Sequence, residues 1–323
     1  MSLTQLRLSM LGTLVLIIGM STLFFTVILT LLGVGIVAIG LFVIIFNVAQ
    51  WLLGPYLIQF MCHVRPAQRS DYPKQFEMVT KISQKAGIKE PKLMIANMPA
   101  PNAFAYGSPL TGNRVALTTG LLNELNDEEV EAVLGHELGH LKHRDVQLMM
   151  FVSVLPSLAY FIGYSLVLSS MFGGTTARNK KQSGGTTAAI GAICILIYFI
   201  LTLFVLELSR LREYYADRHS VSVVEDGSRK LSEGLAKIVS YSARMRNNRQ
   251  QSKNMHSFKS LFITDPDRAV SDAAEVAQMR GYASPQMLVQ EIMARKITTT
   301  DKITEALSTH PNIVKRLRAI LEA

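Results

Sequence analysis

Charged residues are missing from three long segments of this 323-residue chain. No Asp, Glu, Lys or Arg occurs between Arg7 and Arg65, from Val146 to Ala177, or from Gln182 to Leu206. Over the whole chain 18% of residues are charged, against about 25% in soluble domains. Because about 20 apolar residues cross a bilayer as a helix, the first segment has room for two spans and the others for one each. The sequence therefore predicts an integral membrane protein with four transmembrane helices.

Other absences narrow the class of protein further. The chain has two cysteines, Cys62 and Cys194, both in or beside apolar segments, so no disulfide framework is expected. No GxxxxGK[ST] motif occurs, which argues against a nucleotide partner and ATP-driven chemistry. The net charge is +9, and its strongest local excess lies in residues 244–259. Without interleaved aromatics this segment does not indicate nucleic acid binding; it favours a solvated loop, with an anionic lipid surface as the alternative.

The four apolar segments are expected to form two antiparallel hairpins. The predicted spans cover about residues 8–32, 36–58, 148–172 and 188–206. Basic residues near the span ends place the intervening parts in the cytoplasm by the positive-inside rule, although Arg178, Lys180 and Lys181 oppose this orientation. The predicted organisation is hairpin 1 in residues 1–61, a cytoplasmic part in 62–146, hairpin 2 in 147–206 and a second cytoplasmic part in 207–323.

The first cytoplasmic part combines short strands with a helix. Residues 93–96, 103–106 and 115–118 alternate β-prone runs with turn residues and predict a small sheet. Asn126 is a predicted N-cap with Glu129 at the capping-box position, and the helix that follows is expected to run to about His143. The predicted fold class is a mostly α integral membrane protein with a cytoplasmic α+β part.

This helix carries the motif HELGH, residues 136–140. His136 and His140 are four residues apart and project from one helix face, while Glu137 lies about 100° around and can reach a water on a shared metal. The pattern is typical of zinc hydrolases. His143 follows three residues later, but a third ligand from the same helix is poorly placed, so we expect it to lie outside the metal site.

A catalytic zinc needs three protein ligands and an open position. The best remaining candidate is Glu213 in SRLREYYAD, with Asp217 one turn later on the same helix face. Asp217 is then expected to accept a hydrogen bond from a ligand histidine. The competing interpretation is an ion-pair-rich helix end beside Arg210 and Arg212, and the residues of this segment alone do not exclude it.

The ordered set of motifs resembles the HtpX-type integral-membrane zinc metalloproteases, relatives of the CAAX prenyl endopeptidases and of Oma-type proteases. The matching pieces are the amino-terminal apolar hairpin, PNAFAYG, HELGHLKHRD, the two later spans, REYYAD and THPNIVKRLRAI. The resemblance implies one catalytic Zn²⁺ bound by His136, His140 and Glu213, with Glu137 as the catalytic base.

The resemblance also assigns roles to two further segments. It implies that Asn102 and the backbone of Ala103, Phe104 and Ala105 pair with an extended peptide substrate. It further implies that His310 or Arg316 stabilises the oxyanion, although a surface helix with a capping histidine would fit those residues equally well.

The expected function is ATP-independent cleavage of misfolded or damaged membrane proteins at the cytoplasmic side of the cell membrane. A dedicated processing peptidase for a lipidated or prenylated substrate is the first alternative, and a membrane adaptor with a structural zinc is the second. The sequence does not define the oligomeric state.

Overall fold

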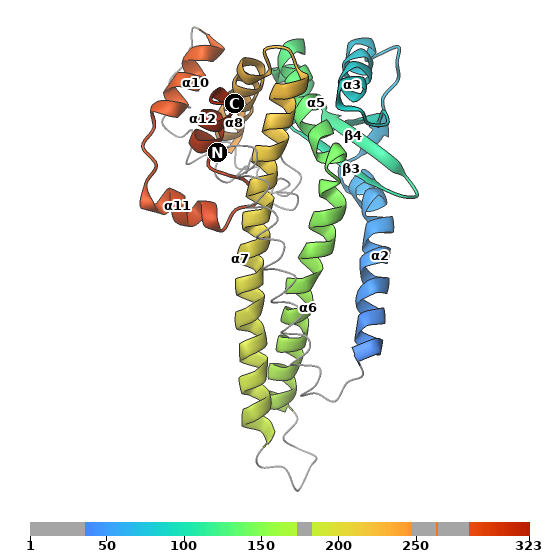
Figure 1. Cartoon of the computed structure of the whole chain (residues 1–323), viewed down its shortest axis with the longest axis vertical. Coiled ribbons are helices and arrows are strands. Elements are labelled where there is room, and N and C mark those ends of the chain that lie inside the picture. The colour runs from blue at the N-terminus through green and yellow to red at the C-terminus, as the bar shows by residue number, and fades with distance from the viewer. Residues whose placement is uncertain (1–35, 173–182, 247–262, 264–283) are drawn as a thin grey trace. The chain divides into compact units, whose positions relative to one another are not determined.

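The computed structural model describes residues 36–172, 183–246, 263 and 284–323 (Figure 1). These residues form a mostly helical fold with one small sheet. The helices are α2 (Ile36–Met61), α3 (Pro73–Ala86), α4 (Thr119–Glu124), α5 (Asp127–Lys142), α6 (Asp145–Phe172), α7 (Ser183–Val223), α8 (Gly227–Arg246), α10 (Pro285–Ala294), α11 (Thr299–Ala306) and α12 (Ile313–Leu321).

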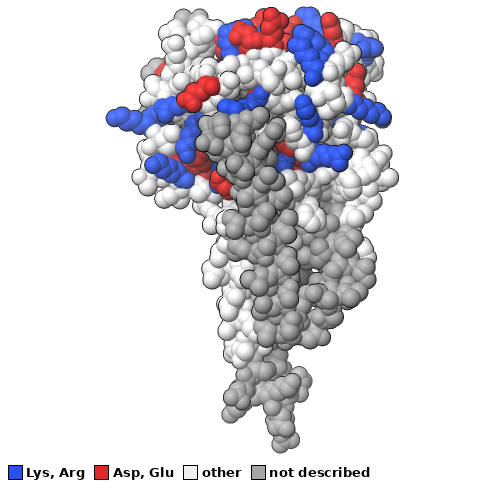
Figure 2. Space-filling view, in the orientation of Figure 1, with Lys and Arg blue, Asp and Glu red and all other residues white. Residues whose placement is uncertain are grey.

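The chain divides into two compact units. The described residues of the first unit are Trp51–Val146 with 209–246, 263 and 284–323; those of the second are 36–50, 147–172 and 183–208. The described part of the second unit carries a single charged side chain, that of Glu207, whereas Lys, Arg, Asp and Glu side chains gather on one part of the face drawn in Figure 2. The contrast agrees with an apolar environment for the second unit.

Two described stretches are long and apolar enough to cross a membrane, Asp145–Tyr164 and Gly185–Val223. They correspond to the third and fourth predicted spans, which lie side by side as α6 and α7 (Figure 1). The two helices approach closely where Gly163 meets Gly191, since a Cβ built on Gly163 would lie 2.9 Å from the Gly191 carbonyl oxygen. Small residues permit such close packing of membrane helices.

Of the other two predicted spans, the structure describes only the second. The second apolar segment is helical, as α2, which agrees with the expectation from its sequence. The first predicted span, residues 8–32, lies outside the described residues. A total of four spans therefore stays a prediction.

The predicted strands are confirmed, and a fourth is added. The sheet contains β1 (Val64–Pro66), β2 (Lys92–Ala96), β3 (Ala103–Ser108) and β4 (Gly112–Thr118) in the order β1-β2-β4-β3. β2 and β4 are parallel, whereas β1–β2 and β3–β4 are antiparallel. The β3–β4 turn needs Gly112, whose φ of +69° is costly for residues with a Cβ. Because β3 is the last strand in this order, it forms one edge of the described sheet.

Helix α5 begins as its sequence predicts. The Asn126 side chain accepts a hydrogen bond from the Glu129 amide, and the Glu129 carboxylate accepts one from the Asn126 amide. The helix packs into the main core of the first unit through Val130, Val133, Leu134 and Leu138. Burial of such side chains stabilises the fold by about 1.5–3 kcal/mol each, so the core holds α5 firmly in place.

Two glycines bring α5 against α7. A Cβ built on Gly135 would lie 2.9 Å from Ser220 Oγ, and one on Gly139 would lie 3.1 Å from the His219 side chain. Ser220 Oγ also donates a 2.6 Å hydrogen bond to the Ala132 carbonyl. The glycines of GHELGH thus allow the close contact that brings the histidines of α5 to the polar end of α7.

Candidate metal centre

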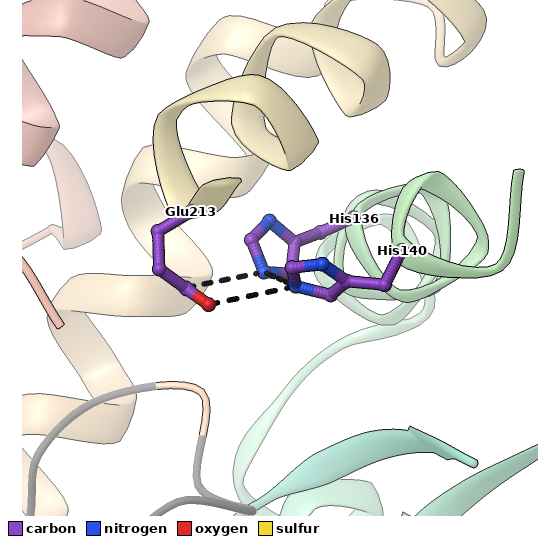
Figure 3. A group of neighbouring side chains, drawn as sticks. All are labelled: His136, His140 and Glu213. Atoms are coloured by element: carbon purple, nitrogen blue, oxygen red, sulfur yellow. Dashed lines mark hydrogen bonds and ion pairs between the residues drawn. The ribbon is translucent and has the colours of Figure 1, made fainter. Parts of the chain in front are cut away.

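Three side chains from two helices converge in the first unit (Figure 3). His136 and His140 come from successive turns of α5, and Glu213 comes from α7, which continues without a break from the predicted fourth span. The two histidine Nε2 atoms are 3.2 Å apart. Each lies 3.5 Å from one oxygen of the Glu213 carboxylate.

The other nitrogen of each imidazole meets a carboxylate. His136 Nδ1 lies 2.9 Å from Asp217 Oδ1. His140 Nδ1 lies 2.7 Å from Asp145 Oδ2, a contact that the sequence did not predict. When both Nδ1 atoms donate to these carboxylates, both Nε2 atoms present lone pairs to each other. Two facing lone pairs require a cation or a proton between them.

The donor spacing fits a tetrahedral metal ion. Ligand bonds of about 2.0–2.2 Å at tetrahedral angles put donor atoms about 3.3–3.6 Å apart, which agrees with the separations of 3.2, 3.5 and 3.5 Å. Glu213 Oε2 is buried, lies 3.3 Å from Arg316 Nη1 and accepts no hydrogen bond of normal geometry. A buried carboxylate beside two imidazole nitrogens is the donor chemistry of a zinc site.

The electrostatics of the two histidines differ. Burial by itself lowers the pKa of His136, but hydrogen bonds to Asp217 and Glu213 outweigh it and raise the pKa to about 9. Burial and the neighbouring His136 lower the pKa of His140 to about 4. The neighbouring carboxylates thus act mainly on His136, and burial acts mainly on His140.

Glu137 is 4% exposed and lies on α5 beside strand β3. Burial raises the pKa of its carboxyl group, while a hydrogen bond from the Ala105 amide acts in the opposite direction. A carboxyl group with a raised pKa at a site edge is suited to accepting and returning a proton.

Arg316 from α12 reaches the site from the carboxyl-terminal part of the chain. It is 1% exposed and donates to both oxygens of Asp217, each at 2.7 Å. It also lies 3.3 Å from Glu213 Oε2 and donates to the Ile263 carbonyl at 2.6 Å. These partners occupy the guanidinium group, so its principal contacts are with residues of the site.

His310 approaches the other oxygen of Glu213, with its Nε2 3.9 Å from Glu213 Oε1. Its loop is anchored by Arg210, which donates to the carbonyls of Glu305 and Ser308, each at 2.7 Å. Arg210 also belongs to α7. The same helix therefore carries Glu213 and fixes the loop that presents His310.

The candidate substrate strand has its groups arranged by the sheet register. The Thr118 amide donates to the Asn102 carbonyl at 3.0 Å, and antiparallel pairing alternates along a strand. Ala103 and Ala105 therefore direct their main-chain groups away from β4, whereas Phe104 directs its own toward β4. The Asn102 side chain is buried, and its Oδ1 accepts a 2.9 Å hydrogen bond from the Ile263 amide.

His143 lies outside this group, as expected. It is the C-cap of α5, and its ring packs against Tyr215 with centroids 4.3 Å apart. The two cysteines are free and buried. The basic segment 244–259 lies largely outside the described residues; Arg244, its first residue, pairs with Glu124 at 2.8 Å.

Comparison with known proteins places this fold and site in a family. Residues 73–323 match the description "Peptidase family M48", so the chain belongs to this family and is a metallopeptidase. Protease HtpX homolog 1 of Sulfurisphaera tokodaii is 33% identical over 268 residues, which cover 82% of this chain and 79% of that protein. The Protease HtpX homolog of Aeropyrum pernix is 36% identical over 241 residues, covering 74% and 72%. The predicted resemblance to HtpX-type proteases is confirmed.

A solved structure agrees at the level of the fold. The crystal structure of S. mikatae Ste24p superposes with a TM-score of 0.51 at 15% identity, covering 98% of this chain and 67% of that chain. The similarity supports a common architecture for the two chains.

Proposed function

We propose that His136, His140 and Glu213 hold one zinc ion and that the protein is a membrane-bound endopeptidase using Glu137 as its base. The observation that carries this proposal is the convergence of the two Nε2 atoms and the Glu213 carboxylate. Three protein donors are the number that a catalytic zinc site uses, because its fourth position is taken by water or substrate. A structural zinc in an adaptor would be expected to have a fourth protein ligand, and none joins this group among the described residues.

The residues around the proposed ion have separate roles in hydrolysis. Bound zinc supplies Lewis-acid activation of water and of the scissile carbonyl. The Glu137 carboxylate takes the proton from the attacking water and passes it to the leaving amine. His310 donates a hydrogen bond to the developing oxyanion. Arg316, held by Asp217, fixes the carboxylate partner of His136.

The substrates proposed are extended polypeptide segments. A peptide that pairs with the outward-facing groups of Ala103 and with the Ala105 carbonyl would join the sheet as an added strand, which requires no particular side-chain sequence. Asn102 supports this strand through its bond to Ile263. A main-chain mode of recognition suits damaged or misfolded membrane proteins of varied sequence. One lipidated substrate class is the alternative, and it would require selection by side chain or lipid.

Metal removal tests the enzymatic part of the proposal. Protein purified in detergent should cleave an unfolded test polypeptide, lose activity after chelation and dialysis, and recover it with one equivalent of zinc but not of magnesium. Cleavage that persists in metal-free protein would contradict the proposal. A broad set of cleavage sites is expected for quality control, whereas cleavage of lipidated peptides alone would favour the processing alternative.

Cysteine labelling tests the proposed cytoplasmic position of the site. In a Cys62→Ala, Cys194→Ala background, Ser183→Cys at the start of α7 should react with an impermeant reagent from outside the cell. Gln84→Cys on the exposed face of α3 should react after permeabilisation only. The reverse pattern would put the metal site outside, and labelling of both from one side would contradict a spanning second hairpin.

A further inference from the structure

We propose that Asp145 and Arg212 form a positioning pair for His140, and that this pair helps to determine the affinity of the site for its metal. The inference rests on the proposed zinc site and adds two residues to it. Asp145 Oδ2 lies 2.7 Å from His140 Nδ1. Its other oxygen, Oδ1, forms an ion pair with the Arg212 guanidinium. Asp145 thus bridges a metal ligand and a buried cation.

Burial makes the bridge effective. The side chains of Asp145 and Arg212 are 7% and 3% exposed, so solvent screens their interaction weakly. A buried carboxylate or guanidinium group without a partner is strongly disfavoured. Each group therefore restricts the other, and the pair as a whole restricts the orientation of the His140 ring.

The chain places Asp145 by a local backbone feature. Helix α5 ends at Lys142, and Arg144 adopts a φ of +55°, which is uncommon for a residue with a Cβ. The chain turns there and α6 begins at Asp145, whose side chain returns to His140 on the last turn of α5. Asp145 therefore lies at the start of α6, and its partner Arg212 lies on α7.

The same order of groups occurs twice at the site. His136 contacts Asp217, which is bound by Arg316; the second set is His140, Asp145 and Arg212. A carboxylate that accepts from Nδ1–H keeps Nε2 unprotonated and aimed at the metal. Arg212 is also the neighbour of Glu213 on α7, so one ion pair connects the segment holding the third ligand to the segment holding His140.

Asp145→Asn tests the role of the carboxylate. We expect the dissociation constant for zinc to rise by about 10- to 100-fold, the range typical of residues that orient metal ligands. It is measured by competition with a chromophoric chelator on the full-length protein in detergent. The visible spectrum of the cobalt-substituted protein should also change, because the orientation of one imidazole is altered.

The matched control is Asp127→Asn. Asp127 is the first residue of α5 as Asp145 is of α6, so both variants lose an acid from a first helical turn. Asp127 is exposed and pairs with Lys74, away from the metal site. Zinc affinity and the cobalt spectrum should therefore stay at wild-type values. Identical values for both Asn variants would overturn the proposal.

Arg212 provides a second route if Asp145→Asn folds poorly. Arg212→Met should weaken zinc binding, and Arg212→Lys should restore part of it because a cation is returned to Asp145. In the double variant Asp145→Asn/Arg212→Met, the loss should be smaller than the product of the two single losses, since the groups act together. Independent losses would contradict the pair. Wild-type protein that binds no zinc would instead reject the proposed function itself.

Discussion

Glu137→Gln should reduce peptide hydrolysis by about 10²- to 10⁴-fold, the usual contribution of a positioned general base. The amide keeps the shape of the side chain but cannot accept the proton of the attacking water. The zinc content should stay near one per chain, because Glu137 lies outside the group of three converging donors. Turnover of a quenched peptide and metal analysis of the same sample measure both quantities.

Glu128→Gln is the matched control for this variant. Glu128 is an exposed residue of α5 that pairs with Arg229 at 2.9 Å, so its loss changes the helix charge equally without touching the site. The control should retain wild-type turnover. Hydrolysis by metal-loaded Glu137→Gln at the wild-type rate would show that another group accepts the proton.

Local sequence signals predicted the parts of the site that depend on one helix. The spacing of His136 and His140 places both on one face of α5 whatever the rest of the fold does. The capping box at Asn126 fixes where that helix starts. The strand predictions succeeded for a similar reason, since alternation and turn residues are local properties.

The contacts that the sequence left undefined join distant segments or depend on one backbone angle. The contact of Asp145 with His140 was not predicted, because the chain turns between them at Arg144 with a positive φ. No local residue pattern indicates that backbone angle. The contact of Arg210 with the carbonyls at the end of α11 spans more than 90 residues. Strand β1 has three residues, too few for a period of two to be recognised.

Arg316 shows how far a motif can define a role. The resemblance placed it near the site as a candidate for oxyanion stabilisation. The structure adds that both oxygens of Asp217 bind its guanidinium group, at 2.7 Å each. These contacts, which depend on tertiary geometry, engage the guanidinium group with residues beside the three donors. Oxyanion stabilisation by His310 or Arg316 stays a prediction.

Glu213→Ala should cause a large loss of metal, because it removes one of the three proposed protein ligands. Loss of a residue that orients a ligand, such as Asp217, typically lowers metal affinity by about 10- to 100-fold, and we expect a larger loss here. No hydrolysis should be measurable at stoichiometric zinc. The variant should still fold, since Arg316 keeps its two bonds to Asp217. Zinc per chain after dialysis, with thermal unfolding of the metal-free protein, measures both effects.

His143→Ala supplies the comparison on the neighbouring helix end. His143 is the histidine nearest to HELGH in sequence, yet its ring packs against Tyr215 and His219 rather than joining the three donors. Its removal should leave the zinc content near the wild-type value. If His143→Ala lost zinc while Glu213→Ala retained it, the third ligand would have to come from α5, and the role of α7 in completing the site would be wrong. Zinc lost from Glu213→Ala and retained by His143→Ala would instead support Glu213 of α7 as the third ligand.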